Sequence, residues 1–252
     1  MVLDLNGKRA LVLGASRGLC MAIAKPLAAE GATVFAAARS RDKIADWAEG
    51  MAVECDLSDL AQVDALADQL LSDGGADIIV NNGGGPPPGT AQAAERGQWL
   101  AHFEAMAANL FHLNTRLLPE MKVRGWGRII SITSSGVEQP IPNLALSNGI
   151  LSAVVGWSKT LANEVAGDGI TVNVVMPGRI HTQRVDELDA AAAKRTDSDV
   201  AEVAARSRAT IPAGRYGKPE EFADVVTFLA SARAGYVTGS RIRIDGGAIK
   251  GI

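Results

Sequence analysis

The sequence predicts an α/β protein built on a doubly wound, seven-stranded parallel sheet in three layers, α/β/α. Three observations predict this class. Short aliphatic runs alternate along the chain with amphipathic helical patterns. Strands joined by right-handed crossovers form a parallel sheet with helices on both faces. Glycine or proline follows several of the runs, at the strand ends where such sheets bind ligands.

Each predicted strand is a short run of β-branched and aliphatic residues. In chain order the strands cover residues 9–14, 33–38, 51–55, 76–81, 128–133, 170–176 and 241–244. Helical patterns separate them, and we predict helices over residues 22–30, 60–71, 98–122, 147–165 and 219–230.

Two segments depart from this alternation of strands and amphipathic helices. Residues 82–89 hold three glycines followed by three prolines and a glycine, which excludes both a helix and a central strand, so we expect a loop. Residues 182–208 are rich in alanine and charge, with few apolar positions, and we predict a mobile helical lid there. The whole chain, residues 1–252, reads as a single domain.

The opening turn organises the chain. A buried strand ends at Gly14, a turn passes through Gly18, and a helix follows. Free N–H groups and the positive end of the helix dipole would suit a pyrophosphate. An ordinary strand-to-helix turn is the alternative interpretation.

The composition of the chain limits the kinds of binding partner that we expect. The chain is 47% apolar with a formal net charge of -3 and no basic run, so we expect neither nucleic acid nor an acidic membrane as a partner. The apolar runs have the length of strands, and no leader pattern opens the chain. Cys20 and Cys55 lack the CxxC spacing, which favours reduced thiols in a cytoplasmic protein, and we expect no metal.

Several motifs together resemble the short-chain dehydrogenase/reductase family over nearly the whole chain. Within that family the sequence is most similar to β-ketoacyl carrier-protein reductases. The motifs are Gly14-Ala-Ser-Arg-Gly18, Cys55-Asp-Leu57, Asn81-Asn-Gly-Gly84, Asn109, Gly127-Arg-Ile-Ile-Ser-Ile-Thr-Ser134, Gly169-Ile-Thr-Val-Asn173, Pro177-Gly178 and Asp245-Gly-Gly247. The resemblance implies a Rossmann-type fold and a nicotinamide dinucleotide.

The resemblance also implies which residues hold that cofactor. The implied set runs from the turn to the end of the sixth strand: Gly14, Ser16, Arg17, Gly18, Leu19, Asp56, Leu57, Asn82, Gly83, Pro177, Gly178, Ile180 and Thr182. The second strand ends at Arg39 with no acidic residue, and an arginine suits a 2′-phosphate. We therefore favour NADP(H) over NAD(H), with Arg17 as a second cation. The alternative is that both arginines are solvated surface charges.

The catalytic set departs from the family. Its members pair a serine with Tyr-x-x-x-Lys on the next helix and an asparagine on the helix before. Ser134 and Asn109 occupy the serine and asparagine positions, but Ser147 and Leu151 stand where the tyrosine and lysine are expected. A phenol beside an ammonium can move a proton to a carbonyl oxygen, whereas an alcohol beside an aliphatic chain lacks the required acidity.

Few other side chains could replace the missing tyrosine and lysine. His181 is the best substitute acid or base, although a solvated loop histidine is the alternative, and Ser134 alone could polarise a carbonyl or merely satisfy a strand end. His102 and His112 are interpreted as packing or interface residues. Cys20 stands where the family has a third glycine, and we interpret it as a small buried residue rather than a reactive thiol.

Three functions stay open from the sequence. The first is an atypical oxidoreductase acting on a carbonyl or alcohol, similar to a 3-oxoacyl carrier-protein reductase. The second is a non-catalytic dinucleotide-binding protein, a sensor or partner subunit. The third is proton transfer or elimination on the same scaffold. The resemblance also implies a homodimer or homotetramer that pairs the two long helices.

Overall fold

The structure is a computed structural model, and it describes residues 3–45 and 51–251. Seven strands form one sheet in the order β3-β2-β1-β4-β5-β6-β7, and every neighbouring pair is parallel. The strands are β1 (Arg9–Leu13), β2 (Thr33–Ala38), β3 (Ala52–Glu54), β4 (Ile78–Asn81), β5 (Gly127–Ile132), β6 (Ile170–Pro177) and β7 (Arg241–Ile244). The doubly wound, seven-stranded fold predicted from the sequence is therefore confirmed.

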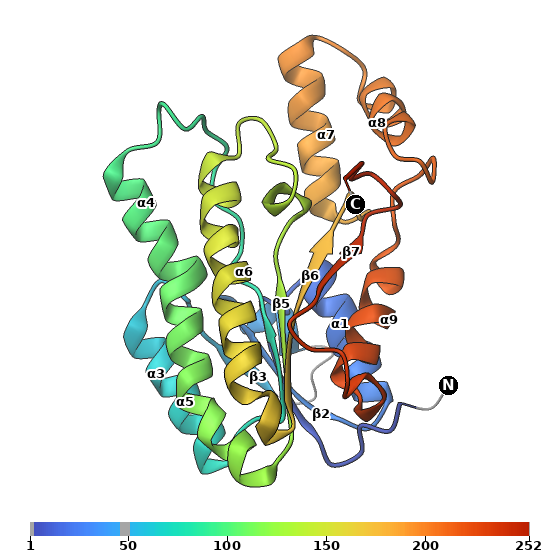
Figure 1. Cartoon of the computed structure of the whole chain (residues 1–252). Helices are drawn as coiled ribbons and strands as arrows, with labels where there is room; N and C mark the ends of the chain where they lie inside the picture. Colours follow the sequence, from blue (N-terminus) through green and yellow to red (C-terminus); the bar gives the residue numbers. More distant parts are fainter. Residues whose placement is uncertain (1–2, 46–50, 252) are drawn as a thin grey trace.

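Helices cover both faces of the sheet (Figure 1). They are α1 (Gly18–Ala29), α2 (Asp42–Ala45), α3 (Leu60–Ser72), α4 (Arg96–Phe103), α5 (Asn109–Arg124), α6 (Ala145–Val165), α7 (Gln183–Thr196), α8 (Val200–Ala209) and α9 (Pro219–Ala230). Short turns of other helical types are η1 (Glu104–Ala108), η2 (Ser135–Val137), η3 (Ala166–Asp168) and η4 (Ala232–Ala234).

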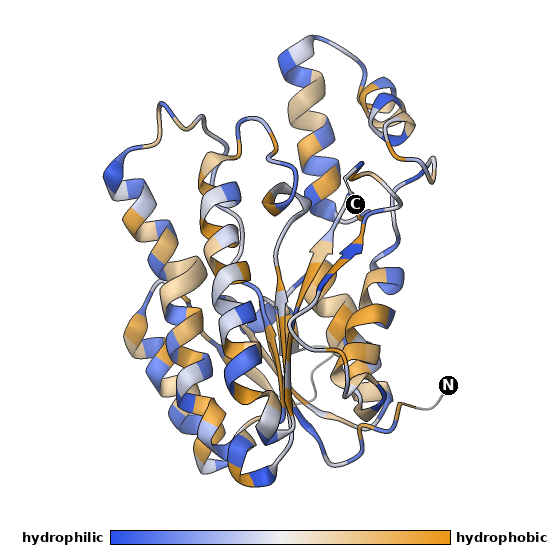
Figure 2. Ribbon diagram, in the orientation of Figure 1, coloured by the Kyte–Doolittle hydropathy of each residue, from blue (hydrophilic) through white to orange (hydrophobic). Residues whose placement is uncertain are grey.

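The core has two main layers, one on each side of the sheet. Side chains alternate along each strand, so Ala10 and Val12 face α1 and α9 while Leu11 and Leu13 face α3 and α5. Figure 2 shows the hydrophobic colour concentrated on the strands and on the helices that pack against them. Within the described residues, no helix has the length and apolarity that a membrane crossing requires.

The helix predicted over residues 147–165 begins two residues earlier, at Ala145, and three other predicted helical segments differ more from the structure. The first begins at Gly18 rather than at residue 22, directly after the turn. The predicted helix over residues 98–122 is three segments: α4, the π-helical turn η1 and α5. The predicted lid contains two helices, because the chain adopts a left-handed conformation at Asp197 and the Asp199 carboxylate then caps α8.

Candidate functional site

The predicted dinucleotide site opens at the turn between β1 and α1. Gly14 and Gly18 have φ of +72° and +62°, which side chains rarely adopt. A methyl carbon added at Gly14 would lie 2.5 Å from the Asn82 Nδ2 atom, so the Asn82 side chain would have to shift if Gly14 were replaced. The turn therefore lies close against the loop that follows β4.

The first turn of α1 has no side-chain cap. Its N-cap residue, Arg17, makes no capping hydrogen bond, and no acidic residue stands in the first turn. The amide groups at this helix end are therefore free to bind an anion, where the helix dipole favours negative charge. This arrangement fits the pyrophosphate of a dinucleotide.

The segment after β3 has a firmly held carboxylate. The Asp56 Oδ1 atom accepts hydrogen bonds from the Ser58 N–H at 2.9 Å and the Ser58 hydroxyl at 2.8 Å. The Ser58 N–H, its hydroxyl and the nearby charge of Arg39 hold the pKa of Asp56 below its usual range. Arg39 therefore lies near Asp56 at the end of β2, beside the segment predicted to meet the adenine.

The other end of the site forms where β6 stops. A methyl carbon added at Gly178 would lie 2.6 Å from the Asp245 Cα atom, and the Gly178 N–H donates to the Ile244 carbonyl at 2.9 Å. Ile180 is buried and bridges to Gly217. Thr182 is the N-cap residue of α7 and its Cγ2 atom would lie 3.9 Å from a methyl carbon added at Gly18. The start of α7 thus approaches the turn before α1.

Arg17 links that turn to α7. Its Nη1 atom lies 3.5 Å from the Gln183 Oε1 atom and 3.5 Å from the Glu187 Oε1 atom. These exposed contacts are weak. The guanidinium is therefore free to exchange partners, and it borders a groove of about 470 Å³ between α1, α9 and the start of α7.

Ser134 stands at the end of β5, at the start of η2. Its Oγ atom accepts a hydrogen bond from the Gly136 N–H at 3.1 Å. A methyl carbon added at Gly136 would lie 3.4 Å from this oxygen and 2.4 Å from the Asn148 Oδ1 atom, so the Ser134 turn packs on the first turn of α6. Ser147 lies in that same helical turn and is half-buried.

Leu151 lies one turn further along α6, where the family pattern has a lysine. It is 8% exposed and belongs to an apolar cluster with Met106, Ala107, Leu146, Ile150 and Val154. Met106 comes from the π-helical turn η1. The wall behind Ser147 is therefore hydrocarbon contributed by two helices.

Asn109 and Met106 face different parts of the site. The Asn109 side chain is buried, and its Nδ2 atom donates to the Leu57 carbonyl at 2.8 Å. Met106 lies one turn earlier, and its Cα atom would be 2.7 Å from a methyl carbon added at Gly83. The structure thus brings Asn109 to the Asp56–Leu57 segment and Met106 to the Asn82–Gly83 loop.

His181 is oriented toward α7. Its Nε2 atom lies 3.1 Å from the Asp186 Oδ1 atom, both side chains are largely exposed, and its ring lies 6.2 Å from the ring of Tyr216. His112 lies 2.7 Å from Asp64, on the face that α5 presents to α3. This contact agrees with the packing role expected for His112.

The two cysteines are buried and unpaired. Burial raises the pKa of the Cys20 thiol to about 12, partly offset by a hydrogen bond with Asn82. Burial and the nearby Asp56 and Asp59 raise the pKa of Cys55 to about 11. Both thiols stay protonated near neutral pH, which agrees with the interpretation of Cys20 as a small buried residue.

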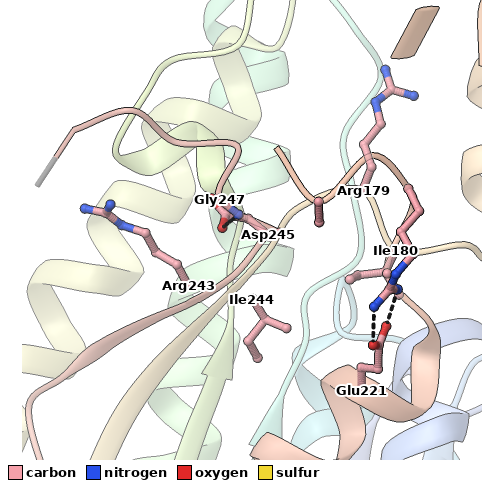
Figure 3. Close-up of a pocket in the computed structure, with 11 residues that line it drawn as sticks. Arg179, Ile180, Glu221, Arg243, Ile244, Asp245 and Gly247 are labelled. Carbon is pink, nitrogen blue, oxygen red and sulfur yellow. Dashed lines mark hydrogen bonds and ion pairs between the residues drawn. The ribbon is translucent and has the colours of Figure 1, made fainter. Parts of the chain in front are cut away.

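A cavity of about 310 Å³ lies beside Ile180 (Figure 3). Three arginines line it, and each guanidinium has a carboxylate partner: Arg179 with Asp189, Arg215 with Glu221 and Arg243 with Glu138. In Figure 3 the Arg179 and Arg243 side chains point in different directions. The arginines therefore connect loops and helices, and do not converge on one anion.

One part of this network, around Asp189, has no signal in the sequence. The Asp189 carboxylate on α7 is buried and accepts hydrogen bonds from Arg179 at 2.9 Å and from the Tyr216 hydroxyl at 2.6 Å. Burial and Asp189 raise the pKa of Tyr216. Asp189 lies in an alanine-rich, charged segment, so only its burial could have identified it. Across residues 3–45 and 51–251, no group of three or more His, Cys, Asp or Glu side chains is placed to hold a metal ion.

Known proteins resemble this chain over its whole length. Residues 14–248 match the family described as enoyl-(acyl carrier protein) reductase. The 3-oxoacyl-(acyl-carrier-protein) reductase FabG of Escherichia coli is 35% identical over 253 residues, covering 97% of this chain and 98% of that protein. FabG of Haemophilus influenzae is 34% identical over 249 residues, covering 96% and 98%. The L-sorbose reductase of Gluconobacter frateurii, solved with NADPH and L-sorbose, superposes with a TM-score of 0.94 at 33% identity and covers 100% of both chains.

Proposed function

Because the chain belongs to the short-chain dehydrogenase/reductase family and is an oxidoreductase, we propose that it uses NADP(H) to interconvert a carbonyl and an alcohol. The substrate is a small molecule of the 3-oxoacyl type or a similar carbonyl compound. The 3-oxoacyl reductases and the sugar reductase among its relatives support this class.

The uncapped start of α1 carries the proposal. Gly14 and Gly18 leave room for a pyrophosphate, and the free amide groups of α1 supply its hydrogen-bond donors. When bound, the nicotinamide gives or takes the hydride. Asp56 and Leu57 would contact the adenine, Asn82 and Gly83 the ribose, and Ile180 and Thr182 the carboxamide end, with Ser16, Leu19, Pro177 and Gly178 completing the groove.

The preference for the phosphorylated coenzyme rests on charge. β2 ends in Ala38 and is followed by Arg39, and Arg17 stands in the turn before α1. The two residues that directly follow β2, Arg39 and Ser40, carry no carboxylate to bind an unmodified ribose or to repel a phosphate. Arg17 exchanges its weak contacts with α7 for the 2′-phosphate. Relatives solved with NADPH support the same preference.

We assign polarisation of the substrate carbonyl to the Ser134 hydroxyl, with Ser147 as a second hydroxyl from the adjoining turn of α6. Neither alcohol is a strong acid at neutral pH, and Leu151 supplies no positive charge. His181 is engaged with Asp186. The proton on the product oxygen therefore comes from a water molecule that the two hydroxyls orient.

Turnover tests the proposal. The purified protein is incubated with NADPH and a panel of 3-oxoacyl thioesters, ketoses and simple ketones, and loss of reduced-coenzyme absorbance is followed. We expect slow but saturable reduction of at least one class. Loss of that activity in Ser134→Ala, with NADPH affinity unchanged, supports the assigned role. Tight NADPH binding without turnover on any substrate would instead indicate a non-catalytic binder.

We also propose a homodimer or homotetramer in the cytoplasm. The resemblance to the family and the exposed apolar side chains Leu100, Phe103 and Val123 on α4 and α5 support self-association. The two free thiols support a reducing compartment.

A further inference from the structure

One asparagine links two segments that are far apart in the sequence. Asn109 begins α5, directly after the π-helical turn η1, and is 4% exposed. Its Nδ2 atom lies 2.8 Å from the carbonyl oxygen of Leu57, 52 residues earlier. This oxygen follows β3, in the segment proposed to meet the adenine.

The π-helical turn sets the direction of this side chain. The Asn109 N–H donates to the Glu104 carbonyl, five residues back, so η1 holds one residue more than an α-helical turn. One extra residue rotates the following side chains by about 100° relative to an uninterrupted helix. Asn109 therefore points to Leu57, while Met106 packs on Gly83.

Other hydrogen bonds hold the same segment, but they come from nearby in the sequence. The Asp56 N–H donates to the Gln62 Oε1 atom at 2.9 Å, and Ser58 binds the Asp56 carboxylate. The Cys55 N–H donates to the Ala38 carbonyl at 3.1 Å. Of the side-chain hydrogen bonds described here, the one from Asn109 fixes the segment to α5.

We propose that Asn109 is a positioning residue that holds the Asp56–Leu57 segment at the adenine end, and that it does not act at the reacting carbonyl. This role rests on the proposed function, because it assumes that a dinucleotide occupies the groove. It also separates this asparagine from the role that its place in the family pattern implies. The part of the same helix that lies near the ribose loop is Met106.

Binding of coenzyme halves tests this role. Isothermal calorimetry would measure NADPH, adenosine 2′,5′-bisphosphate and reduced nicotinamide mononucleotide against the wild type, Asn109→Leu and Asn109→Asp. Leucine has a similar volume without the donor, and aspartate keeps the shape but places an acceptor against the carbonyl. Thr115→Ala, at an exposed position on the same helix, is the control.

Both Asn109 variants should bind adenosine 2′,5′-bisphosphate about fivefold or more weakly than the wild type, because one hydrogen bond is lost. Reduced nicotinamide mononucleotide should bind to both Asn109 variants with an affinity within about twofold of the wild-type value. Both ligands should bind to the control, Thr115→Ala, with affinities in the same range. Amide hydrogen exchange at residues 57 and 58 should be faster in Asn109→Leu than in the control without any ligand, at equal melting temperature.

Two results overturn the proposal separately from the proposed function. Wild-type affinity for the adenosine bisphosphate in both Asn109 variants would remove the positioning role. A loss confined to the mononucleotide would move Asn109 to the reacting end. If the wild type binds no nicotinamide coenzyme at all, the proposed function fails, and this role fails with it.

Discussion

Leu151 marks the departure from the family pattern. The pattern has a lysine at this position, but here the side chain lies in one apolar cluster with Met106, Ile150 and Val154. A buried hydrocarbon wall cannot hold an ammonium or the water that would hydrate it. Under the proposed function, the proton therefore reaches the product oxygen from the side of Ser134 and Ser147.

Introducing the missing lysine alone should harm the fold. Leu151→Lys places an ammonium at a position that is 8% exposed, and we expect a loss of about 2–4 kcal/mol in the free energy of unfolding. Leu151→Met, which conserves volume, should cost less than about 1.5 kcal/mol. Urea unfolding would measure both. Equal stability of Leu151→Lys and wild type would show that this wall is open to water.

The Cys20 thiol should be inert in the native protein. Its pKa is raised to about 12 by burial, above the value of about 8.5 in an unfolded chain. The protonated thiol therefore contributes stability that is fully present below about pH 8.5 and is lost as the pH rises toward 12. A Cys55→Ala variant isolates this thiol. It should react slowly with a disulfide reagent at pH 8 and at once when unfolded; rapid native reaction would contradict the buried placement.

At the scale of elements, one buried carboxylate on α7 connects this helix to two loops. Asp189 accepts hydrogen bonds from Arg179, which follows β6, and from Tyr216, which follows α8. The contacts of α7 with the turn before α1 are exposed and long by comparison. The position of α7 over the groove therefore depends on Asp189 more than on Glu187.

Removing that carboxylate should loosen α7. In Asp189→Ala the Tyr216 hydroxyl loses its partner, and we expect α7 to open more readily by about 1–3 kcal/mol. Limited trypsin digestion should then cut faster at Arg184, Lys194 and Arg195. Asp186→Ala is the matched control, because Asp186 lies on the same helix, is exposed and contacts only His181 among the interactions described. Identical cleavage rates in the two variants would exclude Asp189 as the anchor.

The sequence patterns predicted where strands and helices lie better than they predicted where a helix is interrupted. The strand over residues 33–38 and the helix over residues 219–230 have the predicted bounds, since a short apolar run, Pro219 and the acidic first turn define them locally. The π-helical turn inside residues 98–122 was not predicted, because its residues have ordinary helical propensities. Within this turn Met106 lies close to Gly83, a contact between distant segments that local sequence patterns do not predict.

At the scale of the whole molecule, the sheet order brings the predicted residues together. Gly14, Asn82, Ser134 and Pro177 follow or end β1, β4, β5 and β6, which are neighbours in the sheet, so all four lie at one edge. The parallel topology predicts this from sequence. The partners of individual side chains do not follow from it: Asn109 reaches Leu57, and His181 turns to Asp186, because both depend on how α5 and α7 pack.

At the scale of the whole molecule we also expect the chain to self-associate. We expect light scattering at micromolar concentration to give the mass of a dimer or tetramer of the 26.2 kDa chain. Replacing Phe103, which is 40% exposed on α4, by aspartate should shift the mass downward if that face is the interface. A monomeric wild type would contradict the expectation.

The measurement that tests the account most directly is calorimetric titration of the wild type with NADPH, NADP⁺, NADH and NAD⁺. We predict binding of the phosphorylated coenzymes, with an advantage over the unphosphorylated pair that falls by about tenfold or more in an Arg17→Ala, Arg39→Ala double variant. Absence of heat and of any thermal stabilisation with all four coenzymes would contradict the assignment of the groove before α1.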